Sequence, residues 1–307
     1  MAFTAKDVQT LREKTGVGMM ECKKALSATD GDMDKAIDIL REKGLAAAAK
    51  KASRIAAEGA VYAYVDNEKK VGVVVEVNAE TDFAAKSDKF QEFVSGVAAV
   101  IAANDPADVA ALLEMPYGNG TTVAEALREK VLVIGENLSV RRFVRYEGDV
   151  VAYVHGGGRI GVLVKFDADA AASGSEALKE CGKDVAMQIA ALNAQYLDKE
   201  TVPAADIEKE REITVAQIQA DPKNASKPEA IIAKMVDGRI NKFFKENCLL
   251  QQEFVKDSSM TVAQYIDAEA KKVGGTMKLV DYVRFEKGEG LQKREDNFAD
   301  EVAAMAK

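Results

Sequence analysis

Histidine, cysteine and basic charge are all scarce in this sequence, and each shortage excludes a class of function. His155 is the only histidine. This excludes metal clusters built on several histidines and leaves any Ser-His or Cys-His dyad dependent on one residue. The three cysteines, Cys22, Cys181 and Cys248, are far apart and lack C-x-x-C spacing. They suit buried or idle thiols in a reducing compartment, and we expect no metal site.

Excess positive charge and long apolar segments are missing too. The net charge is −8 and the pI is near 5.1, which argues against direct binding of nucleic acid, because such proteins carry a basic face. No apolar run approaches the ~18 residues of a membrane span, and the first residues lack the apolar core of a signal peptide. A Walker A motif is absent as well. We therefore expect a cytosolic protein, with no membrane contact and no cofactor, that acts on another protein.

The sequence contains enough apolar residues to build ordinary hydrophobic cores. Hydrophobic residues make up 48% and charged residues 30% of the sequence, which is typical of an ordered globular protein. The length of 307 residues indicates about two domains. Residues 1–54 are predicted to form three short helices, the third ending at Gly44, in an arrangement that resembles a ubiquitin-associated type of bundle. Met19 and Met20, beside two glycines, are either core filler or a soft docking patch.

The centre of the chain is an internal duplication. Residues 58–77 align without a gap on residues 147–166, an offset of 89, and nine of the twenty pairs are identical. Each copy has two alternating segments joined by a polar turn and then followed by helices, which predicts two strands and a helical layer. The fold class is therefore α+β, with two duplicated α+β subdomains predicted at 55–142 and 143–285.

The second copy contains a glycine motif that imitates a dinucleotide site. Gly156 to Gly161 fits G-x-G-x-x-G after a predicted strand. Such a site needs a helix to begin at the turn and hold the pyrophosphate, whereas the residues up to Phe166 continue as a strand. We interpret the glycines as a hairpin turn.

An inserted pair of helices is predicted at about 205–245. The first helix is heavily charged, and the second has an apolar stripe from Ile232 to Phe244 at steps of three and four. This favours an antiparallel coiled-coil hairpin, although an ordinary pair of core helices would show the same pattern. Residues 286–307 are predicted to form a C-terminal helical module in which Phe298 either closes the core or belongs to a detachable arm.

The most informative stretch follows the second strand of the first copy. The β-branched run from Val71 to Val77 ends in polar turn residues, and Phe83 stands where a helix begins. Phe83 is either a core staple or a tip presented together with Thr81 and Asp82. The second copy has Asp-Ala-Ala-Ala at the corresponding place, and the missing aromatic there favours presentation.

Three stretches carry a resemblance to a known family. Thr81-Asp-Phe-Ala-Ala-Lys86 closely resembles the signature of the bacterial translation elongation factor Ts family, which usually has Val where this chain has Ala84. The stretch from Leu11 to Leu26 resembles that family's opening module, and Val283 to Gly290 resembles its closing segment.

The resemblance implies a guanine-nucleotide exchange factor, not an enzyme, that binds elongation factor Tu with GDP, displaces Mg²⁺ and promotes GDP release. It implies that the tip displaces the ion while other residues hold the partner, and that the coiled coil protrudes and serves some members as a homodimer contact. The implied tip residues are Thr81, Asp82, Phe83 and Ala84, and the implied holding residues are Leu11, Met19, Met20, His155, Val255 and Phe298. Two rival functions are a dimerising coiled-coil scaffold and a small-molecule enzyme that uses the glycine turn.

Overall fold

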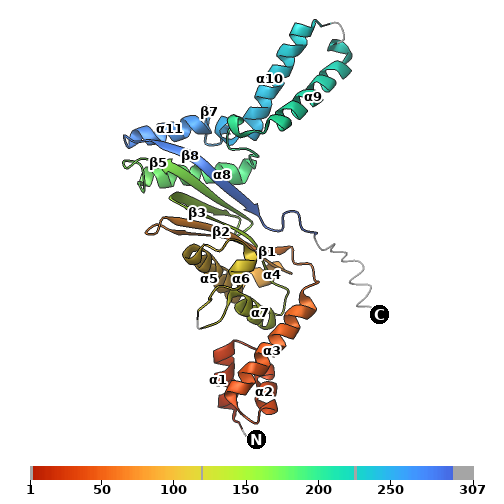
Figure 1. The fold of residues 1–307 in the computed structure, drawn as a ribbon, viewed down its shortest axis with the longest axis vertical. Helices are drawn as coiled ribbons and strands as arrows, with labels where there is room; N and C mark the ends of the chain where they lie inside the picture. Colours follow the sequence, from red (N-terminus) through yellow and green to blue (C-terminus); the bar gives the residue numbers. More distant parts are fainter. Residues whose placement is uncertain (1–2, 119, 225–226, 293–307) are drawn as a thin grey trace.

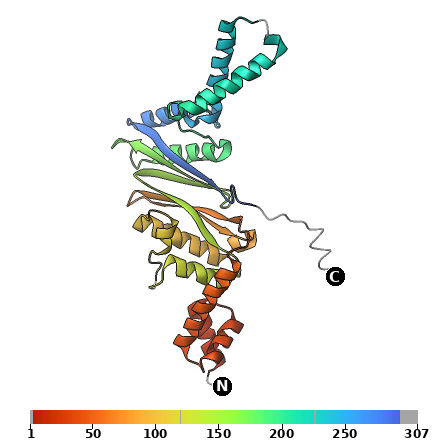
Figure 2. The same ribbon diagram turned by 45° about the vertical axis from the view of Figure 1, so that its right-hand side comes forward.

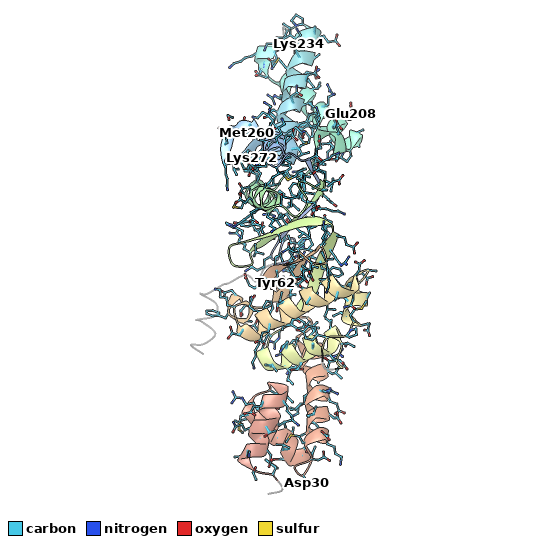
Figure 3. The ribbon with its side chains drawn as sticks, turned by 90° about the vertical axis from the view of Figure 1, so that its left-hand side faces the viewer. Asp30, Tyr62, Glu208, Lys234, Met260 and Lys272 are labelled. Atoms are coloured by element: carbon cyan, nitrogen blue, oxygen red, sulfur yellow. The ribbon has the colours of Figure 1, made fainter. Side chains whose placement is uncertain are left out.

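The computed structural model describes residues 3–118, 120–224 and 227–292 and shows an elongated α+β molecule. A bundle of three helices lies at one end, a pair of long helices lies at the other, and two antiparallel sheets lie between them (Figure 1). Asp30 of the bundle and Lys234 of the helix pair mark the two ends (Figure 3). Phe298 lies outside the described residues.

The N-terminal bundle consists of α1 (Ala5–Thr15), α2 (Met19–Ala28) and α3 (Met33–Lys51). Its core is made by small and aliphatic side chains such as Leu11, Leu26 and Leu40. The expected end of the third helix at Gly44 is wrong, because α3 continues to Lys51. Helices α3 and α7 (Val123–Ile134) are in contact, so the last turns of α3 attach the bundle to the first sheet's helical layer.

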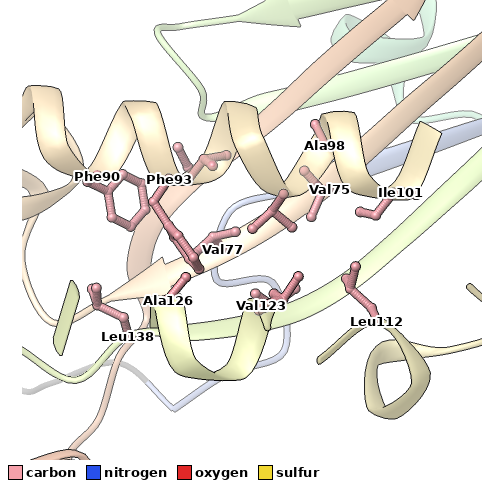
Figure 4. Packing of buried hydrophobic residues seen from close by; sticks show 14 of the residues in the cluster. Val75, Val77, Phe90, Phe93, Ala98, Ile101, Leu112, Val123, Ala126 and Leu138 are labelled. Carbon is pink, nitrogen blue, oxygen red and sulfur yellow. The ribbon is translucent and has the colours of Figure 1, made fainter. Parts of the chain in front are cut away.

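The first sheet has the order β1 (Glu58–Asp66), β2 (Val71–Ala79), β3 (Ser139–Glu147), all antiparallel. Every residue of the central strand β2 is buried. Helices α5 (Asp88–Asn104) and α7 cover one face, and the short helices α4 (Asp82–Ala85) and α6 (Val109–Leu113) complete this layer. Figure 4 shows Phe90 and Phe93 of α5 packed over Val77 of β2.

The second sheet has the order β4 (Asp149–His155), β5 (Ile160–Ala168), β8 (Met277–Glu286). Helices α8 (Glu176–Leu192) and α11 (Val262–Lys272) cover its outer face. A small sheet of β6 (Glu253–Phe254) and β7 (Asp257–Thr261) precedes α11.

The two units correspond in detail at the offset seen in the sequence. Strand β5 occupies the positions of β2 shifted by 89, and the register shift at Glu76/Val77 recurs at Lys165/Phe166. The 17-residue helices α5 and α8 each begin after a capping serine and end at a residue in the left-handed conformation. These shared irregularities support the duplication.

The two sheets face each other, with their helices on the outside (Figure 2). Val61 and Val74 of the first sheet pack against Val150 and Leu163 of the second. Glycines permit this close approach, since a Cβ on Gly72 would come within 2.8 Å of Leu163.

The boundary between the units differs from the expected one. Strand β3 ends at Glu147 and pairs with β2, so a division after residue 142 cuts a strand of the first sheet. The boundary lies at the turn before β4, at Gly148. Sequence alignment alone could not locate it, because β4, the first strand of the second unit, follows β3 after the single residue Gly148.

After β8 the chain returns to the first sheet. The N–H of Gly288 donates to the Glu76 carboxylate at 2.8 Å, and Lys287 forms an ion pair with Glu58. Gly288 has φ +68°, and a Cβ there would lie 2.2 Å from the carbonyl oxygen of Ala57, so glycine is required at this crossing.

The inserted helices are α9 (Ala204–Ala220) and α10 (Glu229–Asn247), close to the predicted 205–245. They pack on each other through Ile218, Val236 and Ile240, in a cluster separate from both sheet cores. An ion pair joins Arg211 to Asp237 at 3.1 Å. The pair protrudes from the second unit (Figure 1).

Candidate functional site

The tip after β2 is a single helical turn that presents an aromatic ring to solvent. Thr81 is the N-cap of α4, and its hydroxyl accepts a hydrogen bond from the Ala84 N–H at 3.2 Å. Ala84 and Ala85 face the first core and are 7% and 6% exposed, whereas Phe83 is 83% exposed. Phe83 therefore does not act as a core staple in this structure.

Two acids attach this turn to the loop between α7 and β3. Glu136 accepts from the Thr81 N–H at 3.0 Å and from the Thr81 hydroxyl at 2.7 Å. Glu80 accepts from the Asn137 N–H at 2.6 Å. The sequence pattern did not single out Glu136, because the partners lie 55 residues apart. Its only local signal is its place just after the glycine that ends α7.

Asp82 adds a negative charge beside the ring. Its carboxylate forms an ion pair with Lys86 at 2.6 Å, and the side chain remains 47% exposed. The hydrogen bond from Lys86 lowers the pKa of Asp82, and the positive charge of Lys287 acts in the same direction. The tip therefore carries an ionised acid next to an exposed apolar surface at neutral pH.

The predicted holding residues of the bundle divide into two groups. Met19 and Met20 are 42% and 63% exposed at the start of α2. Leu11, in contrast, is completely buried among the three helices. The expectation that Leu11 contacts a partner is therefore wrong for this structure: it is an apolar residue on the inner face of α1, where burial stabilises the bundle.

His155 and Val255 lie on separate parts of the second unit. His155 is exposed at the end of β4, and the Tyr153 hydroxyl lies 2.9 Å from its Nδ1 atom. The following glycines have positive φ and form the predicted hairpin turn between β4 and β5. Val255 is 50% exposed in the turn before β7, where its N–H donates to the side-chain oxygen of Gln188 at 2.8 Å.

These side chains do not converge on one pocket. They follow the long axis from α2 through α4 to the vicinity of β7 (Figure 1), an arrangement suited to an extended macromolecular partner. Among the described residues, no group of three or more His, Cys, Asp or Glu side chains could hold a metal ion. In the same part of the chain, no helix has the length and apolar character to cross a membrane.

Comparison with known proteins agrees with these features. The family model for Elongation factor TS matches residues 80–289, which include the tip and the return of the chain to the first sheet. The chain is 49% identical over 304 residues to Elongation factor Ts of Clostridium botulinum, covering 98% of both chains. It is 50% identical over 306 residues to Elongation factor Ts of Clostridium perfringens, covering 99% of both.

Similarity at this level extends over the whole architecture, from the helical bundle to the inserted helices. The residues that the family model covers begin at Glu80, immediately before the presented turn. With the signature, the fold and full-length relatives in agreement, this chain belongs to the elongation factor Ts family and is a translation elongation factor.

Proposed function

We propose that the protein is the guanine-nucleotide exchange factor of elongation factor Tu. It binds the GDP form of that partner, displaces Mg²⁺ and promotes GDP release so that GTP can bind. The observation that carries the proposal is Phe83, an aromatic side chain that is 83% exposed on an anchored turn beside an ionised Asp82. Among the described residues Phe83 is the most exposed of the large hydrophobic side chains, and aromatic residues are enriched in the cores of protein–protein interfaces.

The chemistry of the ion explains how a wedge of this kind would work. Mg²⁺ requires near-ideal octahedral oxygen geometry, so a small displacement of the elements around it spoils the site. Phe83 would enter the partner beside Asp82 and shift those elements. By reciprocity, a factor that binds the nucleotide-free partner more tightly weakens nucleotide binding by the same ratio. No covalent bond is made or broken, so the protein is not an enzyme in this proposal.

The energy required shows that the tip does not act alone. Shifting a two-state equilibrium from 1:99 to 99:1 takes about 5.5 kcal/mol of differential binding. Burial of one large apolar side chain supplies about 1.5–3 kcal/mol. We therefore assign the rest to exposed residues elsewhere on the chain, namely Met19, Met20, His155 and Val255, together with Phe298 of the C-terminal module.

In this proposal each domain of the chain has its own role. Residues 1–54 form a partner-binding module, and the first α+β unit carries the tip. The second unit holds the partner and carries the helix pair, which can join two copies of the chain in a complex with two partners. Residues 286–307 form a C-terminal module that also holds the partner. As a translation factor, the protein acts in the cytoplasm.

The test is the release rate of fluorescent GDP from elongation factor Tu with wild type and Phe83→Ala. We expect wild type to accelerate release at millimolar Mg²⁺ and the variant to lose about 2 kcal/mol or more of this effect, the size of an interface hot spot. In excess chelator the two proteins should differ much less, because the ion is already gone. An equal defect in both conditions would exclude ion displacement, and no acceleration by wild type would favour the dimerising scaffold.

A further inference from the structure

We propose that Glu136 is a positioning residue for nucleotide exchange, which fixes the direction of Phe83 by holding Thr81. The inference rests on the proposed exchange function and assigns a role to a residue outside the tip itself. Glu136 lies in the loop between α7 and β3, and both of its carboxylate oxygens accept hydrogen bonds from Thr81, at 3.0 and 2.7 Å.

The tip needs such a support because α4 is too short to be stable alone. It has four residues, whereas isolated helices shorter than about 12 residues are marginal in water. Thr81 caps this turn by accepting from the Ala84 N–H. A residue that holds the backbone and the hydroxyl of Thr81 at once therefore fixes the start of the turn, and with it the direction in which Phe83 points.

The loop that carries Glu136 is itself well anchored. The N–H of Asn137 donates to Glu80, and its side-chain amide donates to the carbonyl oxygen of Arg54 at 2.9 Å. Leu138, the next residue, is buried in the first core. Glu136 thus transfers the rigidity of the first unit to the tip through hydrogen bonds to an ionised acceptor, which are stronger than neutral ones.

The second unit contains a related pair of an acid and a threonine in reversed places. There the acid, Asp169, lies on the tip and the threonine, Thr276, lies on the loop before β8. Asp169 accepts from the N–H and the hydroxyl of Thr276 at 2.9 and 3.1 Å. This second pair offers a control, because an acid there also accepts from the N–H and the hydroxyl of a threonine, at a tip that presents no aromatic side chain.

The experiment measures GDP release from elongation factor Tu as a function of factor concentration. Glu136→Ala should lower the saturating rate about tenfold, the effect expected from losing charge-assisted hydrogen bonds, with little change in the concentration for half-saturation. Asp169→Ala removes the acceptor of the second pair in the same way and should retain the wild-type rate.

A double variant separates positioning from direct contact. If Glu136 acts only through Phe83, the variant with both Glu136→Ala and Phe83→Ala should release GDP no more slowly than Phe83→Ala alone. Multiplied effects of the two changes would overturn the inference and make Glu136 an independent partner contact. A rate loss matched by a fall in thermal midpoint of many degrees would also overturn it, because the role would then be general stability.

One measurement does not involve the partner at all. In the free protein, Glu136→Ala should accelerate hydrogen exchange of the Thr81 and Ala84 amides at least tenfold and leave the amides of β2 unchanged. Equal protection in both proteins would overturn the anchoring role. Failure of wild type to accelerate GDP release would overturn the proposed function and this inference together, whereas equal acceleration by wild type and Glu136→Ala would overturn this inference alone.

Discussion

The turns that follow β2 and β5 occupy the same place in two related units and end in opposite ways. In the first unit Phe83 is 83% exposed, and in the second unit the corresponding Ala172 is completely buried. Both turns share one contact: the acid after the strand, Glu80 or Asp169, accepts from a backbone N–H in the loop before the last strand of the sheet, that of Asn137 or Thr276. The scaffold is common, and the outcome depends on the few residues that follow.

The difference comes from where the remaining hydrogen-bond acceptors lie. Asp169 also accepts from the N–H groups of Ala171 and Ala172, so its turn closes on itself and directs Ala172 inward. In the first unit Glu136 accepts from Thr81 from outside, and the tip continues as a helical turn. In the second unit, Asp169 of the turn itself directs the turn inward. In the first unit, Glu136 of the neighbouring loop holds a turn that points outward.

The largest loss of stability should follow from placing a phenylalanine, the residue of the first unit's turn, at the corresponding position in the second unit. Ala172→Phe places a large ring where the neighbouring backbone leaves no room, since a Cβ on Gly275 would already lie 3.1 Å from the Ala172 methyl. We expect a loss of about 3 kcal/mol in the free energy of unfolding. Denaturant unfolding followed by circular dichroism measures it.

The reverse exchange supplies the control. Phe83→Ala removes a ring that makes little contact with the folded chain, so the unfolding free energy should change by no more than about 0.5 kcal/mol. Similar losses of unfolding free energy in the two variants would show that the two turns do not differ in packing.

A second contrast lies at the bulge of each central strand, where the first unit has Glu76 and the second has Lys165. Glu76 is completely buried and accepts from Arg141, Arg142 and the Gly288 N–H. Burial alone would raise its pKa, but these hydrogen bonds, with one from Asn78, outweigh it and hold the pKa below the ordinary 4.5. The ionised carboxylate therefore stabilises the fold.

Glu76→Gln should cost about 2 kcal/mol at pH 7, because charge-assisted hydrogen bonds are lost and arginine is left without its partner. A lowered folded-state pKa means that this stabilisation is fully present above the unfolded pKa and disappears as the pH falls through the folded one. The stability gap between wild type and variant should thus narrow below about pH 4.5. Urea midpoints measured from pH 7 to pH 3 would reveal it, and a constant gap would contradict the assignment.

Patterns of local sequence predicted much of this architecture. Alternating apolar residues located β1, β2, β4 and β5, and the 89-residue offset located the second unit. The exposure of Phe83 could be argued only from the missing aromatic in the other copy and from the resemblance to the elongation factor Ts family. Leu11 was misassigned because a motif match does not say which face of a helix a residue occupies.

Contacts between residues far apart in the chain could not be predicted from local sequence patterns. The hydrogen bonds between Glu136 and Thr81 and between Glu76 and Gly288 join positions 55 and 212 apart. The local sequence does not name these partners, and the only local signal of Glu136 is its place after the glycine that ends α7. The end of the first unit at β3 was missed because strand pairing, not composition, defines it.

The smallest loss of stability should follow from removing most of the helix pair α9 and α10, which only the second unit has. Replacing residues 208–242 by a short Gly-Ser bridge keeps Tyr196, Asp206 and Phe243, which form the base of the helix pair. The cluster between α9 and α10 shares no residue with the sheet cores, so the remainder should lose less than about 1 kcal/mol of unfolding free energy.

GDP release from elongation factor Tu should remain substantial in this deletion variant, while any dimer detected by light scattering at matched concentration should disappear. Unfolding of the second unit on deletion would show instead that the helix pair belongs to its core.

The hydrogen bond between Gly288 and Glu76 also has a consequence for synthesis. Its two residues are 212 positions apart, and chains grow at about 5–20 residues per second, so roughly 10–40 s pass between their translation. For that interval the central strand of the first sheet contains an acid that lacks one of its donors. A nascent or prematurely ended chain that stops short of Gly288 therefore has a weakened first sheet, and damage at the carboxyl end reaches the amino-terminal half of the protein.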